Sequence, residues 1–377
     1  MTGAIALATI SLDRMAGGLE RNIVYLANHL AEKGERVVLL SFDRPDAEMF
    51  FELHPAVVWR RVGASAPHQE IGFAERLRLI GRIRRTLTEF SVDVLICFHH
   101  GILARFLAAA AFLGVRIVCS ERNSLTLYRH IRQSKWNLNF LLLFLVGAIT
   151  VQFPSYVNQY PALLRRRIRV IHNPVHSAPA PTAAGRDNNI LSVGRHAAQK
   201  RFDPLIEAFA RATRDDPGWT LTIVGDGPLK SRTEDLVRRL GIADRVTLAD
   251  PTREIAPYYA RARFYCQPSQ WEGFPNALAE AMAAGVIPIG HAQTSGVADL
   301  IEDRANGILA GGAFSVDSLT EGLERAIRSP EQWDRLSENA REISRRYSSD
   351  SWSAGWESLL ADLRSSSRRF SGKESCA

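Results

Sequence analysis

Residues 4–42 read AIALATISLDRMAGGLERNIVYLANHLAEKGERVVLLSF, and their pattern is the clearest indication of the fold class. A short apolar run at its start is followed by the pair Gly17-Gly18 and then by apolar residues at helical spacing, which end at Gly34. A second apolar run occupies residues 37–42. The face that this helix buries is expected to consist of Ile23, Leu26, Ala27 and Leu30. The stretch therefore predicts one strand-helix-strand unit of a parallel sheet that is covered on both faces.

The same alternation continues along the chain. Helices are expected at 74–90, 102–113, 203–214 and 230–240, and strands at 92–98, 115–120, 221–225, 246–249 and 264–268. Only residues 174–188, rich in Pro, Ala and Gly, interrupt the pattern. The predicted fold class is α/β, with two consecutive doubly wound parallel-sheet Rossmann-like domains. The expected organisation is an N-terminal domain 1–173, a linker 174–188, a C-terminal domain 189–345, a helix 346–365 and a disordered tail 366–377.

Composition narrows the class of protein. Of the 377 residues, 46% are hydrophobic and 23% charged, which is typical of a soluble globular protein. A net charge of +7 favours anionic substrates, an anionic membrane surface or a polyanion. Nucleic acid is not expected as a partner, because no recognition motif is present and the arginines are spread over several helices. Cys97, Cys119 and Cys266 lie in apolar strand-like runs, which predicts buried, reduced thiols in a cytoplasmic protein. No signal peptide or transmembrane helix is expected, because no apolar run reaches about 20 residues.

Two glycine-containing turns are candidate phosphate sites. Neither Gly17-Gly18 nor the turn at 225–228 is a complete Gly-x-Gly-x-x-Gly motif followed by a ribose-binding acid, which argues against a nicotinamide-dependent oxidoreductase. Gly17 and Gly18 do precede a helix, whose N-terminus attracts phosphate. The alternative is a tight turn that needs a positive φ angle.

The segment VGRHAAQKR, residues 193–201, follows an apolar strand and contains Arg195, Lys200 and Arg201. Such cations can neutralise a diphosphate, because arginine binds it as a bidentate fork and lysine as a point charge. The alternative is solvated surface charge.

The segment WEGFPNALAEAMAAG, residues 271–285, places Glu272 and Glu280 eight residues apart. On the expected helix Pro275 suits the first turn and Asn276 shares a face with Glu280. The opposite, packed face should consist of Leu278, Ala281, Met282 and Gly285. A carboxylate on a buried helix needs partners, and two vicinal ribose hydroxyls are suitable ones for Glu280. Glu272 is then placed to meet a sugar. A structural salt bridge or an exposed helix face is the alternative for each acid.

This segment resembles the E-x7-E region of retaining glycosyltransferases of family 4, which have the GT-B fold. The resemblance implies that the two domains face each other across a cleft and that the helix 346–365 packs back on the N-terminal domain. Further stretches agree in order, so the resemblance covers residues 3–363. They are GLERNIVYLANHLAEKGERV, VIHNPV, LSVGRHAAQKRFDPLIEAF, LTIVGDGPLK, LIEDRANGILA and YSSDSWSAGWESLL.

The resemblance implies that the C-terminal domain binds a nucleotide-diphosphate sugar, most simply a UDP-sugar, and that the configuration of the transferred sugar is retained. Arg195 and Lys200 would bind the diphosphate and stabilise the leaving group, Glu280 the ribose and Glu272 the transferred sugar. The remaining donor-binding positions implied are Gly17, Gly18, Gly225, Gly273, Phe274, Pro275 and Asn276. The chain has no Asp-x-Asp motif, which agrees with metal-independent chemistry and no further cofactor.

One departure from the family lies in the segment RIVCSERNSL. Many members have a His in this turn, whereas this chain has Ser120-Glu121-Arg122-Asn123. Glu121 is the candidate catalytic residue here, with Arg122 as a positioning group, and His99 and His100 are further candidates. The turn resembles members that extend polyprenyl-diphosphate-linked oligosaccharides with N-acetylhexosamines or hexoses. The implied acceptor is therefore a glycan or a lipid-linked saccharide.

Two N-terminal segments suggest an anionic membrane surface, and hence a location on the inner face of the cell membrane. The helix at 76–90 is expected to turn Leu77, Ile80, Ile83, Leu87 and Phe90 inward and Arg76, Arg78, Arg82 and Arg85 outward. The segment at 128–149 runs from basic to aromatic to apolar. The alternatives are a solvated helix face and a buried helix.

Two rival functions share this architecture. A catalytically silent, nucleotide-sugar-binding regulatory protein would keep the scaffold. The replaced His keeps this alternative open, but the presence of both acids and of the Arg195 and Lys200 pair argues against it. A non-hydrolysing sugar-nucleotide epimerase would need no acceptor, but the order of the cations and acids fits it less well.

Overall fold

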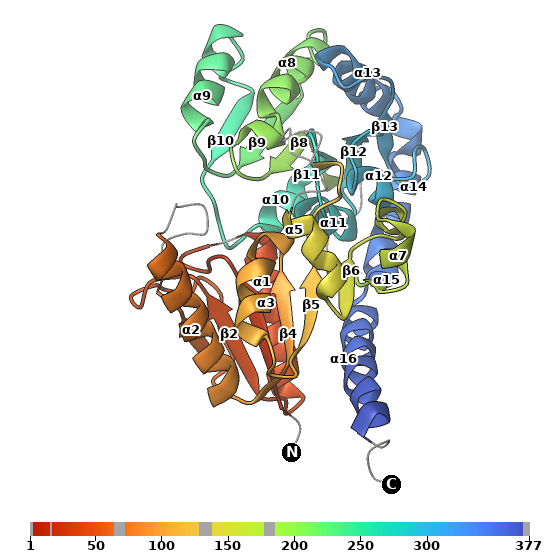
Figure 1. The fold of residues 1–377 in the computed structure, drawn as a ribbon. Helices are drawn as coiled ribbons and strands as arrows, with labels where there is room; N and C mark the ends of the chain where they lie inside the picture. Colours follow the sequence, from red (N-terminus) through yellow and green to blue (C-terminus); the bar gives the residue numbers. More distant parts are fainter. Residues whose placement is uncertain (1–2, 16, 64–71, 128–137, 177–184, 372–377) are drawn as a thin grey trace. The chain divides into compact units, whose positions relative to one another are not determined.

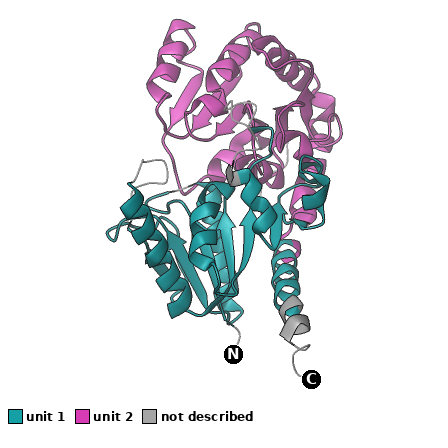
Figure 2. Ribbon diagram, in the orientation of Figure 1, with its two compact units in different colours: residues 1–172, 352–377 teal, residues 173–351 magenta. Residues whose placement is uncertain are grey.

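The computed structural model describes residues 3–15, 17–63, 72–127, 138–176 and 185–371. The chain divides into two compact units (Figure 2): unit 1 comprises residues 1–172 and 352–377, and unit 2 comprises residues 173–351. Each unit contains one sheet in which every strand pairing is parallel, with helices packed against the sheet (Figure 1). The prediction of two doubly wound α/β domains is confirmed.

The sheet of unit 1 has the strand order β3-β2-β1-β4-β5-β6-β7. Its strands are β1 (Ala4–Thr9), β2 (Val37–Ser41), β3 (Val58–Arg61), β4 (Val92–Phe98), β5 (Arg116–Ser120), β6 (Ala148–Val151) and β7 (Ile168–Val170). Its α-helices are α1 (Gly18–Glu32), α2 (Phe73–Glu89), α3 (Leu103–Ala110), α5 (Leu138–Leu141), α6 (Pro154–Val157), α7 (Ala162–Arg165) and most of α16 (Ser349–Ser371). Short 3-10 helices occupy His100–Ile102 and Leu142–Leu145.

The first helix forms as the sequence predicts. All four residues of its expected inner face, Ile23, Leu26, Ala27 and Leu30, are buried against strands β1 and β2 in the core of unit 1. Helix α2 differs from the prediction. Leu79 rather than Leu77 is buried, and Leu77 is 53% exposed. The inner stripe of α2 consists of Leu79, Ile83, Thr86 and Leu87, which lie at helical spacing without Leu77.

The last helix belongs to unit 1 although its sequence follows unit 2 (Figure 2). It buries Trp352, Trp356, Leu359 and Leu360 in the same core as strand β1. Arg364 pairs with Glu35 (Nη1–Oε1 2.7 Å) and with Asp93 (Nε–Oδ2 3.0 Å). The helix continues past residue 365, where the disordered tail was expected to begin, and ends at Ser371. Residues 372–377 lie outside the described part of the chain.

The sheet of unit 2 has the order β10-β9-β8-β11-β12-β13. Its strands are β8 (Asp187–Val193), β9 (Thr220–Val224), β10 (Val246–Ala249), β11 (Ala262–Cys266), β12 (Ile287–His291) and β13 (Ile308–Ala310). Its α-helices are α8 (Phe202–Ala212), α9 (Lys230–Arg239), α10 (Ala256–Arg261), α11 (Asn276–Ala283), α12 (Val297–Leu300), α13 (Val316–Ile327), α14 (Trp333–Arg341) and α15 (Ile343–Arg346). Short 3-10 helices occupy Ala198–Lys200 and Pro330–Gln332. Of the expected linker 174–188, residues 177–184 lie outside the described residues, and 187–188 already belong to β8.

In both sheets the strand order reverses beside the first strand, between β1 and β4 in unit 1 and between β8 and β11 in unit 2. Ligands of such sheets bind outside the carboxyl ends of the strands at this point. The loops after β1, β4, β8 and β11 are therefore the places to look for a site.

Of the basic-to-apolar segment at 128–149, residues 128–137 lie outside the described residues, and the remainder is not one buried helix. It forms α5, a 3-10 turn and the start of strand β6, with Phe140 and Leu143 buried but Leu141 and Leu145 exposed. Within the described residues, no helix combines the length and the apolar character needed to span a membrane. Cys97, Cys119 and Cys266 are buried thiols, as predicted, and Cys376 lies outside the described residues.

Candidate functional site

The site in unit 2 is built where β8 and β11 lie side by side. The turn after β9 packs directly on the turn after β8, because a Cβ on Gly225 would lie 2.0 Å from the carbonyl oxygen of Gly194. Only glycine allows this approach. The two turns are joined by a hydrogen bond from the Gly194 N–H to the Val224 carbonyl (3.0 Å). Gly225 therefore shapes the floor of the site through its backbone.

The ammonium group of Lys200 lies 2.7 Å from Oε1 of Glu272. Their side chains are only 19% and 10% exposed, so the pair is largely shielded from water. The Gln199 amide donates to the Trp271 carbonyl (2.6 Å), and the Gln270 N–H donates to the Gln199 carbonyl (2.8 Å), which ties the two loops together. The predicted cation and the predicted acid, 72 residues apart in sequence, thus meet at the junction of β8 and β11.

Glu272 also accepts a hydrogen bond from the side chain of Gln267, whose Nε2 donates to the same Oε1 (2.8 Å). The Gln267 amide also donates to Ser269 Oγ (2.7 Å) and accepts from the Tyr265 hydroxyl (2.9 Å). Burial, followed by the charges of Glu272 and Glu280, raises the pKa of Tyr265 well above its ordinary value, so its phenol keeps the proton that it donates.

Glu280 lies on α11 and is half-buried, while Leu278, Ala281 and Met282 form the packed face that was expected. Its Oε2 accepts a hydrogen bond from the hydroxyl of buried Tyr259 (3.1 Å), which comes from α10. The helix begins at Asn276, so that Pro275 is its N-cap and does not lie inside the first turn. Asn276 Oδ1 accepts from the Asn173 amide (2.8 Å).

The other donor-site candidates of unit 2 differ in exposure. Gly273, Phe274 and Pro275 are buried, and the Phe274 ring meets Tyr347 edge to face at 5.5 Å. Arg195 is exposed, and its guanidinium makes no hydrogen bond or ion pair with the described residues. Arg201 lies over the ring of Phe314 (3.9 Å), away from the Lys200–Glu272 pair in its interactions.

In unit 1 a second polar cluster lies at the carboxyl ends of β4 and β5. Buried Glu121 accepts two hydrogen bonds from His100, one from the backbone N–H (2.7 Å) and one from Nδ1 (2.8 Å). An ionised carboxylate only accepts, so Nδ1 carries the hydrogen. Burial opposes the charge of Glu121, but the attraction of His100, its hydrogen bonds and the nearby His99 outweigh it and lower the pKa of Glu121 to about 2. Burial likewise lowers the pKa of His100, but Glu121 reverses this and raises it.

His99 stacks on His100, with ring centroids 4.5 Å apart. Its backbone has φ 107°, a region that a non-glycine residue rarely adopts. The Gly101 N–H donates to His99 Nδ1 (2.9 Å), so a neutral His99 carries its hydrogen on Nε2. Arg122 is half-buried, lies over the ring of Phe98 (5.9 Å) and is within 3.5 Å of Ser120 Oγ. The structure thus brings a histidine to the turn that lacks one in sequence, from the neighbouring strand.

The alternative for Gly17-Gly18, a tight turn with positive φ, is wrong. Gly17 has φ −73° and caps α1, and Gly18 is the first helical residue, so neither adopts a positive φ. A Cβ on Gly17 would lie 2.2 Å from Oε2 of Glu20, so a larger residue there would displace the end of that side chain. Burial raises the pKa of the Glu20 carboxyl group. This group lies in the first turn of α1, where the other interpretation of the glycine pair placed a phosphate.

Two other features do not contribute to these clusters. Among the described residues, no group of three or more His, Cys, Asp or Glu side chains is arranged to hold a metal ion.

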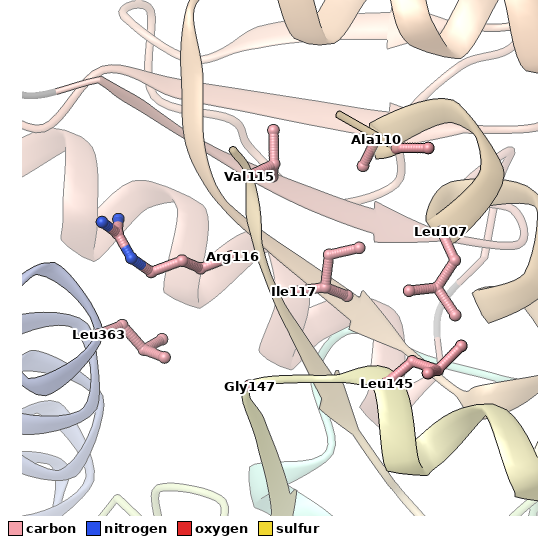
Figure 3. A pocket seen from close by; sticks show the side chains of 9 residues that line it. Leu107, Ala110, Val115, Arg116, Ile117, Leu145, Gly147 and Leu363 are labelled. Atoms are coloured by element: carbon pink, nitrogen blue, oxygen red, sulfur yellow. The ribbon is translucent and has the colours of Figure 1, made fainter. Parts of the chain in front are cut away.

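An apolar pocket of about 420 Å³ in unit 1 lies at the amino ends of β5 and β6 (Figure 3), the edge of the sheet opposite Glu121. Leu107, Ile117, Leu145 and Leu363 line it, with Arg116 at its side.

Sequence reasoning missed Gln267, Tyr265 and Tyr259. The first two belong to the segment FYCQP, which reads simply as an apolar strand, and Tyr259 belongs to a short helix without a motif. The signal available for Gln267 was a polar residue at the carboxyl end of a buried strand, two residues before a serine and five before the first acid.

Two family models match the chain. "Glycosyltransferase Family 4" matches residues 16–178, and "Glycosyl transferases group 1" matches residues 177–343. The two matches meet close to the boundary between the units at residues 172 and 173.

Relatives that match half or more of the chain carry transferase names. A glycosyltransferase of Haemophilus influenzae is 26% identical over 92% of this chain and 96% of its own length. A Campylobacter jejuni N-acetylgalactosaminyltransferase, named for an undecaprenol-diphosphate-linked saccharide, is 24% identical over 93% of this chain and 96% of its own. An exopolysaccharide phosphotransferase of Streptomyces coelicolor is 34% identical over 52% of this chain, which spans only 21% of that longer protein.

Solved structures agree in fold. Sucrose-phosphate synthase from Thermosynechococcus elongatus superposes with a TM-score of 0.79 at 18% identity, over 97% of this chain and 100% of that one. HepE of Anabaena, in complex with UDP and glucose, superposes with a TM-score of 0.77 at 17% identity, over 95% of this chain and 100% of that one. Because the two family models together span residues 16–343 and the architecture is shared throughout, the chain belongs to the glycosyltransferases of the GT-B fold, with a family 4 N-terminal half and a group 1 C-terminal half.

Proposed function

We propose that the protein transfers a sugar from a UDP-sugar to a glycan or a polyprenyl-diphosphate-linked saccharide, with retention of anomeric configuration. The observation that carries the donor half of this proposal is the junction of β8 and β11, where Lys200 and Glu272 pair at 2.7 Å. A cation suited to a diphosphate and a carboxylate suited to sugar hydroxyls stand next to each other there.

Each group has a distinct task in this proposal. Arg195, exposed and unengaged among the described residues, and Lys200 bind the diphosphate and stabilise the charge that develops on the leaving group. Glu280, steadied by Tyr259, accepts hydrogen bonds from the ribose, and Glu272 accepts them from the transferred sugar. The backbone at Gly225 and at 273–276 approaches the donor closely. No metal is required, because the two cations meet the leaving-group charge. Retention is compatible both with front-face attack and with a double displacement.

The UDP assignment is supported by the complex of HepE with UDP and glucose, a protein of the same fold. The lipid-linked acceptor is supported by the Campylobacter relative, whose name specifies an undecaprenol-diphosphate-linked saccharide. The acceptor would contact the carboxyl edge of the unit 1 sheet, where Glu121 and His100 form their pair. Glu121 there orients His100 and His99 toward an acceptor hydroxyl.

The decisive experiment is a thermal-shift panel with UDP, GDP, ADP and their sugar conjugates. A ligand at 100 times its dissociation constant adds about 2.7 kcal/mol, which corresponds to about 5–10 °C for a unit of this size. We expect a shift with UDP and UDP-sugars that Glu280→Ala abolishes and that the exposed control Glu321→Ala retains. Release of UDP on addition of a polyprenyl-diphosphate saccharide would then establish transfer. Binding without any turnover would favour the silent regulatory protein instead.

We further propose that unit 1 docks on the inner, anionic face of the cell membrane through the start of α2. Phe73 and Leu77 are 77% and 53% exposed there, and Arg76 and Arg78 are exposed beside them. Apolar side chains flanked by arginines suit an anionic lipid surface. The first turn of α2 follows β3, so this surface lies at the carboxyl edge of the sheet, the edge assigned to the acceptor.

Sedimentation with phosphatidylglycerol liposomes tests this surface. We expect salt-sensitive binding that the double variant Phe73→Ser/Leu77→Ser loses. Phe112→Ser is the matched control, because Phe112 is fully exposed on the turn between α3 and β5, at the opposite edge. Binding that depended on Phe112 rather than on Phe73 would contradict the proposal.

A further inference from the structure

The carboxyl end of β11 carries a chain of buried polar side chains that the roles above leave without a task. Tyr265, Gln267 and Ser269 are at most 2% exposed. The Tyr265 hydroxyl lies 3.3 Å from both the N–H and the carbonyl of Val193, the last residue of β8. The chain of hydrogen bonds therefore starts at the end of one strand at the junction and passes through Gln267 to Glu272.

The orientation of the Gln267 amide is fixed by its partners. Its Nε2 faces a carboxylate oxygen of Glu272, which can only accept, so the nitrogen and not the oxygen points there. The second hydrogen of Nε2 goes to Ser269 Oγ, and Oε1 accepts from the Tyr265 phenol. The nitrogen and the oxygen of the amide are thus both engaged, and a single rotamer satisfies them.

Fold stability alone does not call for this arrangement. The position lies at the end of a strand whose other residues from Ala262 to Cys266 are all buried, and an apolar side chain there would avoid the cost of burying an amide. A fully satisfied buried network does, however, specify one conformation. The conformation that it specifies here is that of the Glu272 carboxylate.

We propose that Gln267 is a positioning residue for sugar transfer: its amide, held by Tyr265 and Ser269, fixes Glu272 where the carboxylate meets the sugar of the donor. Lys200 attracts the same oxygen, but a lysine ammonium is a point charge on a flexible stem and gives little direction. The planar amide supplies the direction. This inference rests on the proposed donor site, and it predicts that Gln267 acts on the sugar and not on the nucleotide.

The test compares binding of UDP with binding of UDP-N-acetylgalactosamine, or of the UDP-sugar that the wild type binds most tightly in the panel above, by calorimetry. Gln267→Leu keeps the approximate shape and removes the amide. We expect it to leave the dissociation constant of UDP within about twofold. It should weaken binding of the UDP-sugar and lower kcat/KM, each at least about tenfold, because a hydrogen bond to a charged group is lost. Tyr265→Phe should act in the same direction with a smaller effect.

A buried hydrogen bond far from the site provides the matched control. Thr213 is buried, and its hydroxyl donates to the Phe209 carbonyl (2.8 Å) and accepts from Arg245 (3.0 Å). Thr213→Val removes these bonds within the same unit without changing the shape. We expect this variant to have a lower melting temperature than the wild type. Its dissociation constants for UDP and the UDP-sugar and its kcat/KM should be those of the wild type.

A pH profile separates positioning from simple packing. In Gln267→Glu two carboxyl groups face each other, and the like charges raise the pKa of one of them. At low pH the introduced carboxyl group is protonated and donates to Glu272 as the amide did, whereas at high pH both groups ionise and repel. Activity relative to wild type should therefore fall at least about tenfold from about pH 6 to about pH 8.5.

Three results would overturn the inference. The first is a Gln267→Leu variant that, like Thr213→Val, loses only stability. The second is a Gln267→Leu variant that binds UDP and the UDP-sugar more weakly by the same factor, and the third is a Gln267→Glu variant with the wild-type pH profile. Failure of the donor site itself is distinguishable, because the wild type would then bind no member of the panel, and the inference would fall with it.

Discussion

Replacement of Glu121 by Gln tests the buried pair in unit 1. The amide has the shape of the carboxyl group and can still accept hydrogen bonds from His100, but it carries no charge. In the wild type the pKa of Glu121 is about 2, against an ordinary value of 4.5, because the attraction and hydrogen bonds of His100 outweigh burial. In Glu121→Gln burial of His100 is no longer opposed, so the pKa of His100 should fall from its raised value to below 6.5.

The magnitude follows from linkage. A depressed folded-state pKa gives stability that is present above pH 4.5 and is lost as the pH falls toward 2. One pKa unit corresponds to about 1.4 kcal/mol. Protonation of Glu121 therefore lowers the free energy of unfolding of the wild type by about 1.2 kcal/mol when the pH falls from about 5 to about 3.5. The Glu121→Gln variant has no carboxyl group at this position, so its free energy of unfolding does not show this loss. The raised pKa of His100 acts at the other end, since its contribution is complete below pH 6.5 and is lost as the pH rises through the folded-state value.

The assay has two parts. NMR titration of the imidazole protons, with His100→Asn to assign the resonance, measures the pKa of His100 directly. Urea unfolding at the same two pH values measures the free energy of unfolding, and the exposed Glu321→Gln serves as the control. The reasoning is refuted if His100 titrates at the same pH with and without Glu121, or if the gap between wild type and Glu121→Gln is the same at both pH values.

Three further predictions concern unit 2. Lys200→Met, which deprives Glu272 of its cation (2.7 Å), should lower kcat/KM about 100-fold or more, measured as UDP release, and a loss below about threefold would remove Lys200 from leaving-group stabilisation. Arg186→Met should lower the free energy of unfolding by about 3 kcal/mol in urea, because the buried guanidinium donates to carbonyls at the ends of α10 and α11, and a loss below about 1 kcal/mol would mean that water replaces it. Gly225→Ala should abolish the thermal shift with UDP, because its Cβ would collide with the carbonyl of Gly194, and an unchanged shift would show that the two turns can separate.

Local patterns in the sequence were sufficient for the fold. Apolar runs separated by helical spacing predicted both parallel sheets, and the first helix buries the four residues expected of it. The inner face of helix α2 was misplaced because Leu77 and Leu79 both fit an apolar stripe and only contact with the sheet distinguishes them. The short strands β6 and β7 and the edge strands β3 and β13 carry too few residues to show a period.

The candidate site could be predicted only where one short segment carries its own chemistry. Glu272, Glu280 and Lys200 lie in segments whose spacing is informative, and the structure places Lys200 against Glu272. Gln267 and Tyr259 gain their importance from partners brought in by other elements, which no local pattern contains. The contact of His100 with Glu121 is of the same kind, since it depends on β4 and β5 being neighbours in the sheet.

The return of α16 to unit 1 has a consequence for how the chain folds during synthesis. Unit 2 is continuous in sequence and is complete once residue 351 has left the ribosome, whereas unit 1 still lacks Trp352, Trp356, Leu359 and Leu360 at that time. The segment synthesised first is therefore finished last, with an apolar face open until residues 352–360 have been made. A chain that stops before residue 352 would keep both sheets but expose that face, and such a product is a ready target for chaperones and proteases.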